Sequence, residues 1–171
     1  MLPHLTPHKL FVDHRGTLLK NFTSVEACGL FKDQNVAEIF HATSSRGVLR
    51  GLHLQRSPHG IDKIVTVLNG LIHDVVVDVR PGSTTKGKAW AFELNPASGS
   101  SLYIPAGFAH GYQALCDNTI VQYVQSGPYR ADFEAGILWS SFEHAWPIAN
   151  PILSEKDSHL PTLAAYLRAQ T

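Results

Sequence analysis

The sequence predicts a mainly β protein, an antiparallel sandwich or barrel with a few short helices. Hydrophobic residues make up 44% of the 171 residues and charged residues only 16%, a balance typical of a compact β-rich chain rather than of disorder. Short runs of apolar and β-branched residues recur along the chain, and Gly, Pro or Asn turn signals separate them. No internal repeat, linker or low-complexity segment is visible, so we predict a single domain over residues 1–171.

The first part of the chain predicts a hairpin, one short helix and one strand. Residues 9–12 and 17–22 are strand-like segments on either side of the turn Asp13-His14-Arg15-Gly16. A Thr-Ser pair can cap a helix over residues 25–28, which a glycine ends. Residues 36–40 form the next predicted strand.

The remainder predicts strands, with a helix only near the end. Asn69-Gly70 is the strongest hairpin signal in the chain, and it joins predicted strands over 63–68 and 71–80. Helical spacing of apolar residues occurs only over 160–170. The other predicted strands cover 48–55, 90–94, 101–104 and 120–124.

Charge and cysteine content exclude several classes of function. The formal net charge is zero and no basic tract occurs, so neither nucleic acid nor a membrane surface is an expected partner. No apolar run is long enough to cross a bilayer, and the first residues do not resemble a secretion signal. Cys28 and Cys116 are too few and too far apart for a disulfide framework, which favours the reducing cytoplasm.

The strand over residues 48–55 carries the first candidate site residues. Side chains alternate along a strand, so His53 and Gln55 share one face, and Leu52 and Leu54 face the other way. Arg50 would also face away, unless a break at Gly51 turned it into the same cavity. Taken alone, His53 is better interpreted as a core histidine bonded to a backbone carbonyl.

A second histidine changes that interpretation. His110 follows Gly107-Phe108-Ala109, and two histidines on facing strands of a small barrel usually line a ligand pocket. Lys63 opens a strand and Tyr123 lies within one, yet a solvated lysine and a packed core tyrosine are the ordinary interpretations of such positions. Asp157 and Arg15, by themselves, are typical of a polar surface stretch and of a turn.

Two glycine-led segments, 47–70 and 99–110, resemble those of a cupin-type barrel. A metal-binding cupin has a second histidine where Gln55 stands and a glutamate near Lys63. A lysine repels a divalent metal but attracts an anion or a developing oxyanion. The resemblance therefore implies metal-free acid–base chemistry, and we expect no metal ion and no other cofactor.

Further motifs stand in the order found in one family of sugar-nucleotide enzymes. They are Gly47–His53, Lys63–Val65, Asp74–Arg80, Ile104–Gly111, Gly136–Trp139, Trp146-Pro147 and Leu153–Asp157. Over residues 10–161 the chain resembles the dTDP-4-dehydrorhamnose 3,5-epimerases. The resemblance implies a cupin jelly roll, a homodimer that exchanges an N-terminal strand, and a nucleotide-diphosphate 4-keto-6-deoxy sugar as substrate.

The same resemblance implies a role for each site residue. His53 would be the general base, Asp157 its orienting partner and Tyr123 the general acid, while Lys63 would face the enolate oxygen. This set suits the chemistry, because a C4 ketone acidifies the C–H bonds at C3 and C5, and a proton returned to the other face inverts the carbon. The expected substrate contacts are Arg50, His110, Glu38, Gln55 and, from the partner subunit, Arg15.

Departures from the family pattern lie in the recognition positions. The chain has Glu38-Ile39-Phe40-His41 where the family usually has Gln, an acidic residue, Asn and His, and Thr17–Lys20 replaces aromatic residues and a glutamate. A different nucleotide base, a different sugar, or inversion at C3 or C5 alone are therefore open. Alternative functions are a 3,4-ketoisomerase of the same fold and a non-catalytic sugar-binding cupin, while Gln55 and Lys63 disfavour a metal-dependent oxygenase.

Overall fold

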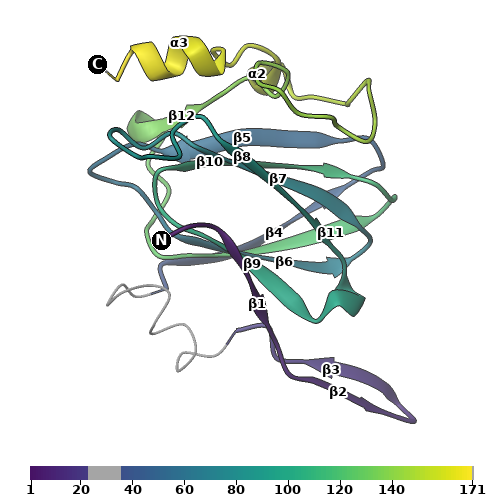
Figure 1. Ribbon diagram of the computed structural model, residues 1–171. Helices are drawn as coiled ribbons and strands as arrows, with labels where there is room; N and C mark the ends of the chain where they lie inside the picture. Colours follow the sequence, from purple (N-terminus) through teal and green to yellow (C-terminus); the bar gives the residue numbers. More distant parts are fainter. Residues whose placement is uncertain (23–35, 171) are drawn as a thin grey trace.

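Two antiparallel sheets of five strands pack face to face in the computed structural model, which describes residues 1–22 and 36–170 (Figure 1). The first sheet, in spatial order, contains β1 (His4–Pro7), β9 (Ser100–Ile104), β6 (Lys63–Asn69), β11 (Thr119–Gln125) and β4 (Glu38–Ser44). The second contains β12 (Glu134–Gly136), β5 (Leu49–Gln55), β10 (Phe108–Ala114), β7 (Ile72–Asp78) and β8 (Ala89–Leu94). The predicted antiparallel sandwich is confirmed.

A separate hairpin projects from one end of the sandwich. It pairs β2 (Leu10–Asp13) with β3 (Gly16–Leu19) around the predicted turn, and Figure 1 shows it standing clear of both sheets. Its apolar side chains, among them Phe11, Val12 and Leu18, are exposed. The helix predicted over residues 25–28 lies outside the described residues.

Helical structure covers the outside of the second sheet. The helices α2 (Glu155–Ser158) and α3 (Leu163–Arg168) lie above this sheet in Figure 1, and two short 3-10 turns, η1 (Pro96–Ser98) and η2 (Ala131–Phe133), connect strands. The sequence predicted α3 within residues 160–170. Its strand ranges do not include β10 (Phe108–Ala114), although His110 was expected on a strand, and it missed α2, β1 and β12. These three elements have only three or four residues each, too few to show a period.

The turn at Asn69-Gly70 corrects one prediction. The turn forms, but β6 and β7 belong to different sheets, so it carries the chain from one layer to the other instead of closing a hairpin. The Asn69 side chain donates to the carbonyl of Asn118 over 2.7 Å, and a Cβ on Gly70 would meet Thr119 Oγ1. Packing against the start of β11 therefore overrides the local hairpin preference.

The second sheet is buried on both faces. Toward the first sheet, Val76 and Tyr112 belong to the core between the layers. On the other face, Val75 and Val77 pack under α3 and under residues 137–147, which we call the covering segment. Burial on both faces explains why residues 75–77 are all valine rather than alternating.

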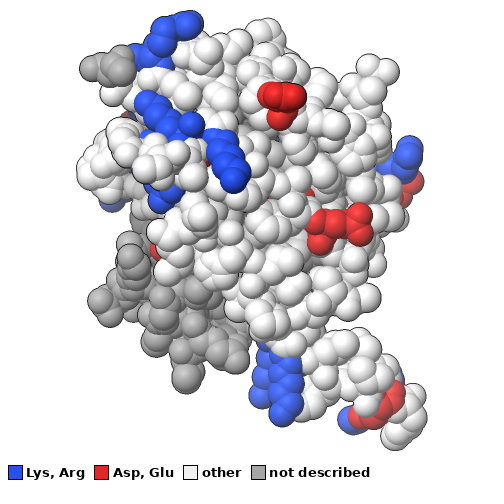
Figure 2. All heavy atoms as spheres, in the orientation of Figure 1, with Lys and Arg blue, Asp and Glu red and all other residues white. Residues whose placement is uncertain are grey.

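Charged side chains do not form a broad patch on the face shown in Figure 2. Small separate groups of basic and acidic side chains interrupt a mostly uncharged surface, and the projecting hairpin carries both signs. Within the described residues, no helix is long and apolar enough to span a membrane.

Candidate active site

A cavity of about 510 Å³ opens between the two sheets and collects most of the predicted site residues. Strands β5 and β10 of one sheet and β4, β6 and β11 of the other supply its walls, and the segment that leads into α2 closes one side. The ionisable side chains at its centre are Arg50, His53, Lys63, His110, Tyr123 and Asp157.

His53 and Asp157 form a carboxylate–imidazole pair. His53 Nε2 lies 2.6 Å from Asp157 Oδ1, and the amide of Gly51 donates to Asp157 Oδ2 over 3.2 Å. Burial alone would raise the pKa of Asp157, but the hydrogen bonds from His53 and Gly51 hold it below its usual value. Asp157 is thus an ionised partner that fixes the imidazole.

Asp157 is buried, with 4% of its surface exposed, so its interpretation as a surface residue is wrong. Ser154 caps α2 by accepting from the amide of Asp157. The preceding segment is fixed to the start of β5, where the amide of Leu49 donates to the carbonyl of Ile152 over 3.0 Å. This tertiary pairing delivers the carboxylate to His53, and no local sequence signal announces it.

A break at Gly51 turns Arg50 into the cavity, as the sequence allowed. Gly51 has a φ of +114°, and the register between β10 and β5 shifts beside it. A Cβ at this position would lie 2.6 Å from the backbone oxygen of His110, so only glycine fits. Arg50 donates to Ser44 Oγ and to the Thr43 carbonyl, which holds its guanidinium against β4.

Lys63 is a cation without a bound partner in the described part of the cavity wall. Burial lowers its pKa to about 8, while the negative charges of Asp74 and Glu134 oppose that shift. No hydrogen bond or ion pair joins its ammonium group to the described residues. An ammonium group that is still protonated at pH 7 is therefore available to an anionic ligand atom.

His110 belongs to a second carboxylate–imidazole pair. It is directly opposite His53 on the neighbouring strand of the same sheet. Its Nε2 lies 2.8 Å from Oδ2 of Asp74, and both residues are buried. The sequence showed Asp74 only as part of an alternating strand. Its side-chain contact with His110, which is the register partner of Val76, arises from the pairing of β10 with β7 and not from a local pattern.

Tyr123 approaches from the other sheet. It lies on the same face of β11 as Val121, as predicted, and it lines the cavity. Burial raises its pKa well above 10, so the phenol is protonated at neutral pH. Phe40 stacks on its ring at 4.9 Å between centroids and 15° between planes, a wall residue that sequence reasoning noted only as a departure from the family.

A cluster of charged and polar side chains at the mouth of the cavity was not predicted from the sequence. Glu134 Oε1 lies 2.5 Å from the ammonium of Lys156, and the Tyr129 hydroxyl donates to Glu134 Oε2 over 2.6 Å. All three residues line the cavity. Their spacing of 5 and 22 positions matches no local period, so only the fold brings them together.

Three residues that were predicted to contact the substrate are bonded to other parts of the chain or lie away from the cavity. Gln55 lines the cavity, but its amide is bonded to the backbone of His59, Pro128 and Arg130, so it braces a loop. Glu38 accepts from the amide of Tyr129 and is not part of the lining. Arg15 lies on the projecting hairpin beside Asp13, with 79% of its side chain exposed, and it is not brought to this cavity within one chain.

Comparisons with known proteins identify the family of this chain. Residues 4–165 match a family model described as dTDP-4-dehydrorhamnose 3,5-epimerase. The dTDP-4-dehydrorhamnose 3,5-epimerase of Escherichia coli K12 is 40% identical to this chain over 164 residues. The match covers 94% of this chain and 89% of the Escherichia coli protein.

Two solved structures superpose over nearly the whole chain. The epimerase of Legionella pneumophila in complex with dTDP-4-keto-L-rhamnose has a TM-score of 0.89 at 30% identity, covering 96% of this chain and 91% of that one. ChmJ, a 3'-monoepimerase of Streptomyces bikiniensis in complex with dTDP-quinovose, has a TM-score of 0.91 at 30% identity, covering 98% and 87%.

Proposed function

Because the chain belongs to the dTDP-4-dehydrorhamnose 3,5-epimerase family, we propose that it inverts C3, C5 or both in a nucleotide-diphosphate 4-keto-6-deoxy sugar through an enolate. The observation that carries this proposal is the arrangement of one base, one cation and one acid around a single cavity. His53 and Lys63 reach it from opposite sheets, and Tyr123 stands on the sheet facing His53.

His53 is the base in this proposal, and Nδ1 is its reacting nitrogen. Asp157 accepts a hydrogen bond from Nε2, so Nε2 carries the proton in the neutral ring and Nδ1 has the free lone pair. Nδ1 then removes the proton from the carbon beside the ketone. The imidazolium that results is stabilised by the ionised carboxylate of Asp157.

Lys63 stabilises the enolate oxygen. Removal of the proton moves negative charge onto the oxygen at C4, and an ammonium group without a competing partner in the described chain interacts more strongly with that charge than with a neutral ketone. His110, held by Asp74 on the neighbouring strand, offers a further polar contact from the sheet that carries His53.

Tyr123 returns the proton. Its raised pKa keeps it protonated, and it stands on the opposite sheet from His53, so it can deliver a proton to the face of the sugar that the base does not reach. Inversion follows because removal and return occur on opposite faces.

Recognition of the nucleotide needs a second subunit in this proposal. Arg50 suits a diphosphate because its planar guanidinium donates in a fork. Arg15 lies on a hairpin whose apolar side chains are exposed, which fits a homodimer in which Arg15 of the partner subunit reaches the nucleotide. We also propose that the protein is located in the cytoplasm.

Inversion at one carbon is the second candidate. It is favoured by the apolar Phe40 stacked on the proposed acid, since a wall of this kind restricts how the sugar can turn between two deprotonations. A 3'-monoepimerase among the structural neighbours fits the same idea.

The test is exchange of substrate protons with solvent. The protein is incubated with dTDP-4-keto-6-deoxyglucose in deuterium oxide, and NMR follows deuterium at C3 and C5. Exchange at both carbons is expected for a 3,5-epimerase, and exchange at one carbon for the second candidate. His53→Asn should abolish it, whereas His144→Asn, a partly exposed histidine in the segment that follows β12 and outside the cavity, should not. Exchange that survives in His53→Asn would overturn the assignment of the base.

A further inference from the structure

Two histidines meet on the outer face of the second sheet, away from the cavity. His73 lies on β7 and His144 in the covering segment that follows β12, and their Nε2 atoms are 2.9 Å apart. Their ring centroids are 5.1 Å apart with planes at 24°, and the Trp146 ring lies edge-on to both. Neither histidine lines the active-site cavity, so the proposed epimerisation does not use this pair.

The two rings face each other through their Nε2 atoms, which leaves one nitrogen of each ring directed at the other. Two neutral imidazoles whose nitrogens point at one another satisfy only one N–H, whereas a metal ion between them uses both lone pairs.

The spacing also suits a shared ion. Two imidazole nitrogens bound to one tetrahedral zinc ion at 2.0–2.1 Å are about 3.3 Å apart. The two Nε2 atoms need to separate by only a few tenths of an ångström to reach that value. Both side chains are partly exposed, so an ion can enter from solvent.

A carboxylate is available on the adjacent strand. Glu93 on β8 is the register partner of His73 and brings a negative charge to its side of the sheet. Directly opposed residues on one face of an antiparallel pair have Cβ atoms about 5 Å apart. No three His, Cys, Asp or Glu side chains within residues 1–22 and 36–170 already converge as a metal site, so Glu93 must turn from solvent to complete this one.

We propose that His73, His144 and Glu93 bind a divalent transition metal ion, with zinc as the probe of choice. Two imidazoles and one carboxylate are a common donor set for such ions, and water can fill the fourth position. The ion would fasten the covering segment, with Trp139 and Trp146, to the sheet that it protects. Its role would be structural, because the site is separate from the catalytic cavity.

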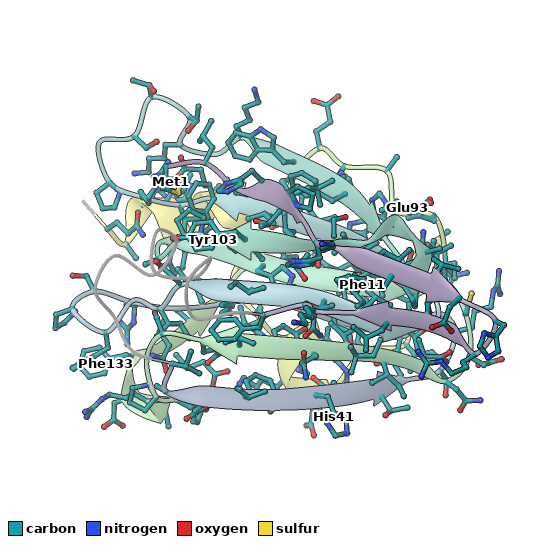
Figure 3. The ribbon with its side chains drawn as sticks, turned by 90° about the horizontal axis from the view of Figure 1, so that it is seen from below. Met1, Phe11, His41, Glu93, Tyr103 and Phe133 are labelled. Atoms are coloured by element: carbon teal, nitrogen blue, oxygen red, sulfur yellow. The ribbon has the colours of Figure 1, made fainter. Side chains whose placement is uncertain are left out.

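The first experiment is a titration of EDTA-treated protein with zinc chloride by isothermal titration calorimetry. We expect one binding event per chain that weakens at least tenfold in His73→Gln and in His144→Gln, and more modestly in Glu93→Gln. His41→Gln is the matched control, because Figure 3 shows His41 and Glu93 on opposite sides of the sandwich. His53→Asn reports any zinc taken up by the cavity.

Thermal unfolding keeps the result interpretable if a variant is less stable. At a zinc concentration about one hundred times the Kd, the Tm of the wild-type protein should rise by about 5–10 °C, and the Tm of His73→Gln should not respond. Absence of zinc binding, or binding that both histidine substitutions leave unchanged, would overturn the proposal and leave a hydrogen-bonded histidine pair.

Discussion

Replacing Lys63 with methionine should make the protein more stable and nearly inactive. The folded protein lowers the pKa of this lysine from 10.5 to about 8 because the side chain is withdrawn from water. At 1.36 kcal/mol per pKa unit the charge destabilises the folded state by about 3 kcal/mol at pH 7, and the part of the side chain open to solvent reduces this to about 2 kcal/mol. Lys63→Met removes that cost while keeping the length of the side chain.

The effect has a definite pH dependence. Below pH 8 the lysine is charged in both states and the full cost is present; between pH 8 and 10.5 the folded state releases the proton first, so stability rises with pH. The advantage of Lys63→Met over wild type should therefore shrink to about half by pH 9.5. Urea denaturation at pH 7 and pH 9.5 measures it, and the Tm at pH 7 should rise by about 4–8 °C.

Catalysis should move in the opposite direction. Loss of the cation beside the enolate should reduce the rate of proton exchange about 100-fold or more, and the wild-type rate should fall as pH rises past 8 because the ammonium group loses its proton. Lys156→Met, at the cavity mouth with its ammonium group already paired to Glu134, is the matched control for stability, since its charge is solvated. A Lys63→Met protein that is less stable than wild type, or that exchanges substrate protons at the wild-type rate, would refute this reasoning.

Three further substitutions test neighbouring parts of the site. Asp157→Asn should lower kcat about 100-fold to 10,000-fold with little change in KM, because His53 loses its ionised partner, and steady-state kinetics decides this. Tyr123→Phe should still incorporate deuterium but retain configuration, because His53 returns the proton to the face it came from; NMR of the recovered sugar distinguishes the two outcomes, and inversion at the wild-type rate would exclude Tyr123 as the acid. Gly51→Ala should lower the Tm by at least about 4 °C, because its Cβ would press on the backbone oxygen of His110 at 2.6 Å; an unchanged Tm would show that the strand break is not needed.

Local patterns predicted the strands well because alternation and turn residues are local properties. The strand around His53 was predicted, and the glycine break that turns Arg50 inward was one of the two alternatives that the sequence left open. The connection at Asn69-Gly70 was not, because a turn signal says that the chain reverses but not which sheet receives the next strand.

The site was predictable only where a single strand carried its residue. Asp157 is brought to His53 by a four-residue helix 104 positions later, and its own surroundings in sequence are polar. Gln55 shares a face with His53 as predicted, yet its amide is occupied by a loop that the pattern could not place. Family resemblance indicated the role of Asp157. The pairing of Asp74 with His110 and of Glu134 with Lys156 could be recognised only in the folded structure.

The late position of Asp157 has a consequence during protein synthesis. Ribosomes add about 5–20 residues per second, so the 104 positions from His53 to Asp157 correspond to about 5–20 s of translation. During that interval the nascent chain has its base but not the carboxylate that sets the tautomer. Acid–base competence should therefore arise only when α2 docks on β5, and a chain stopped before α2 should keep most of its strands while lacking an oriented base.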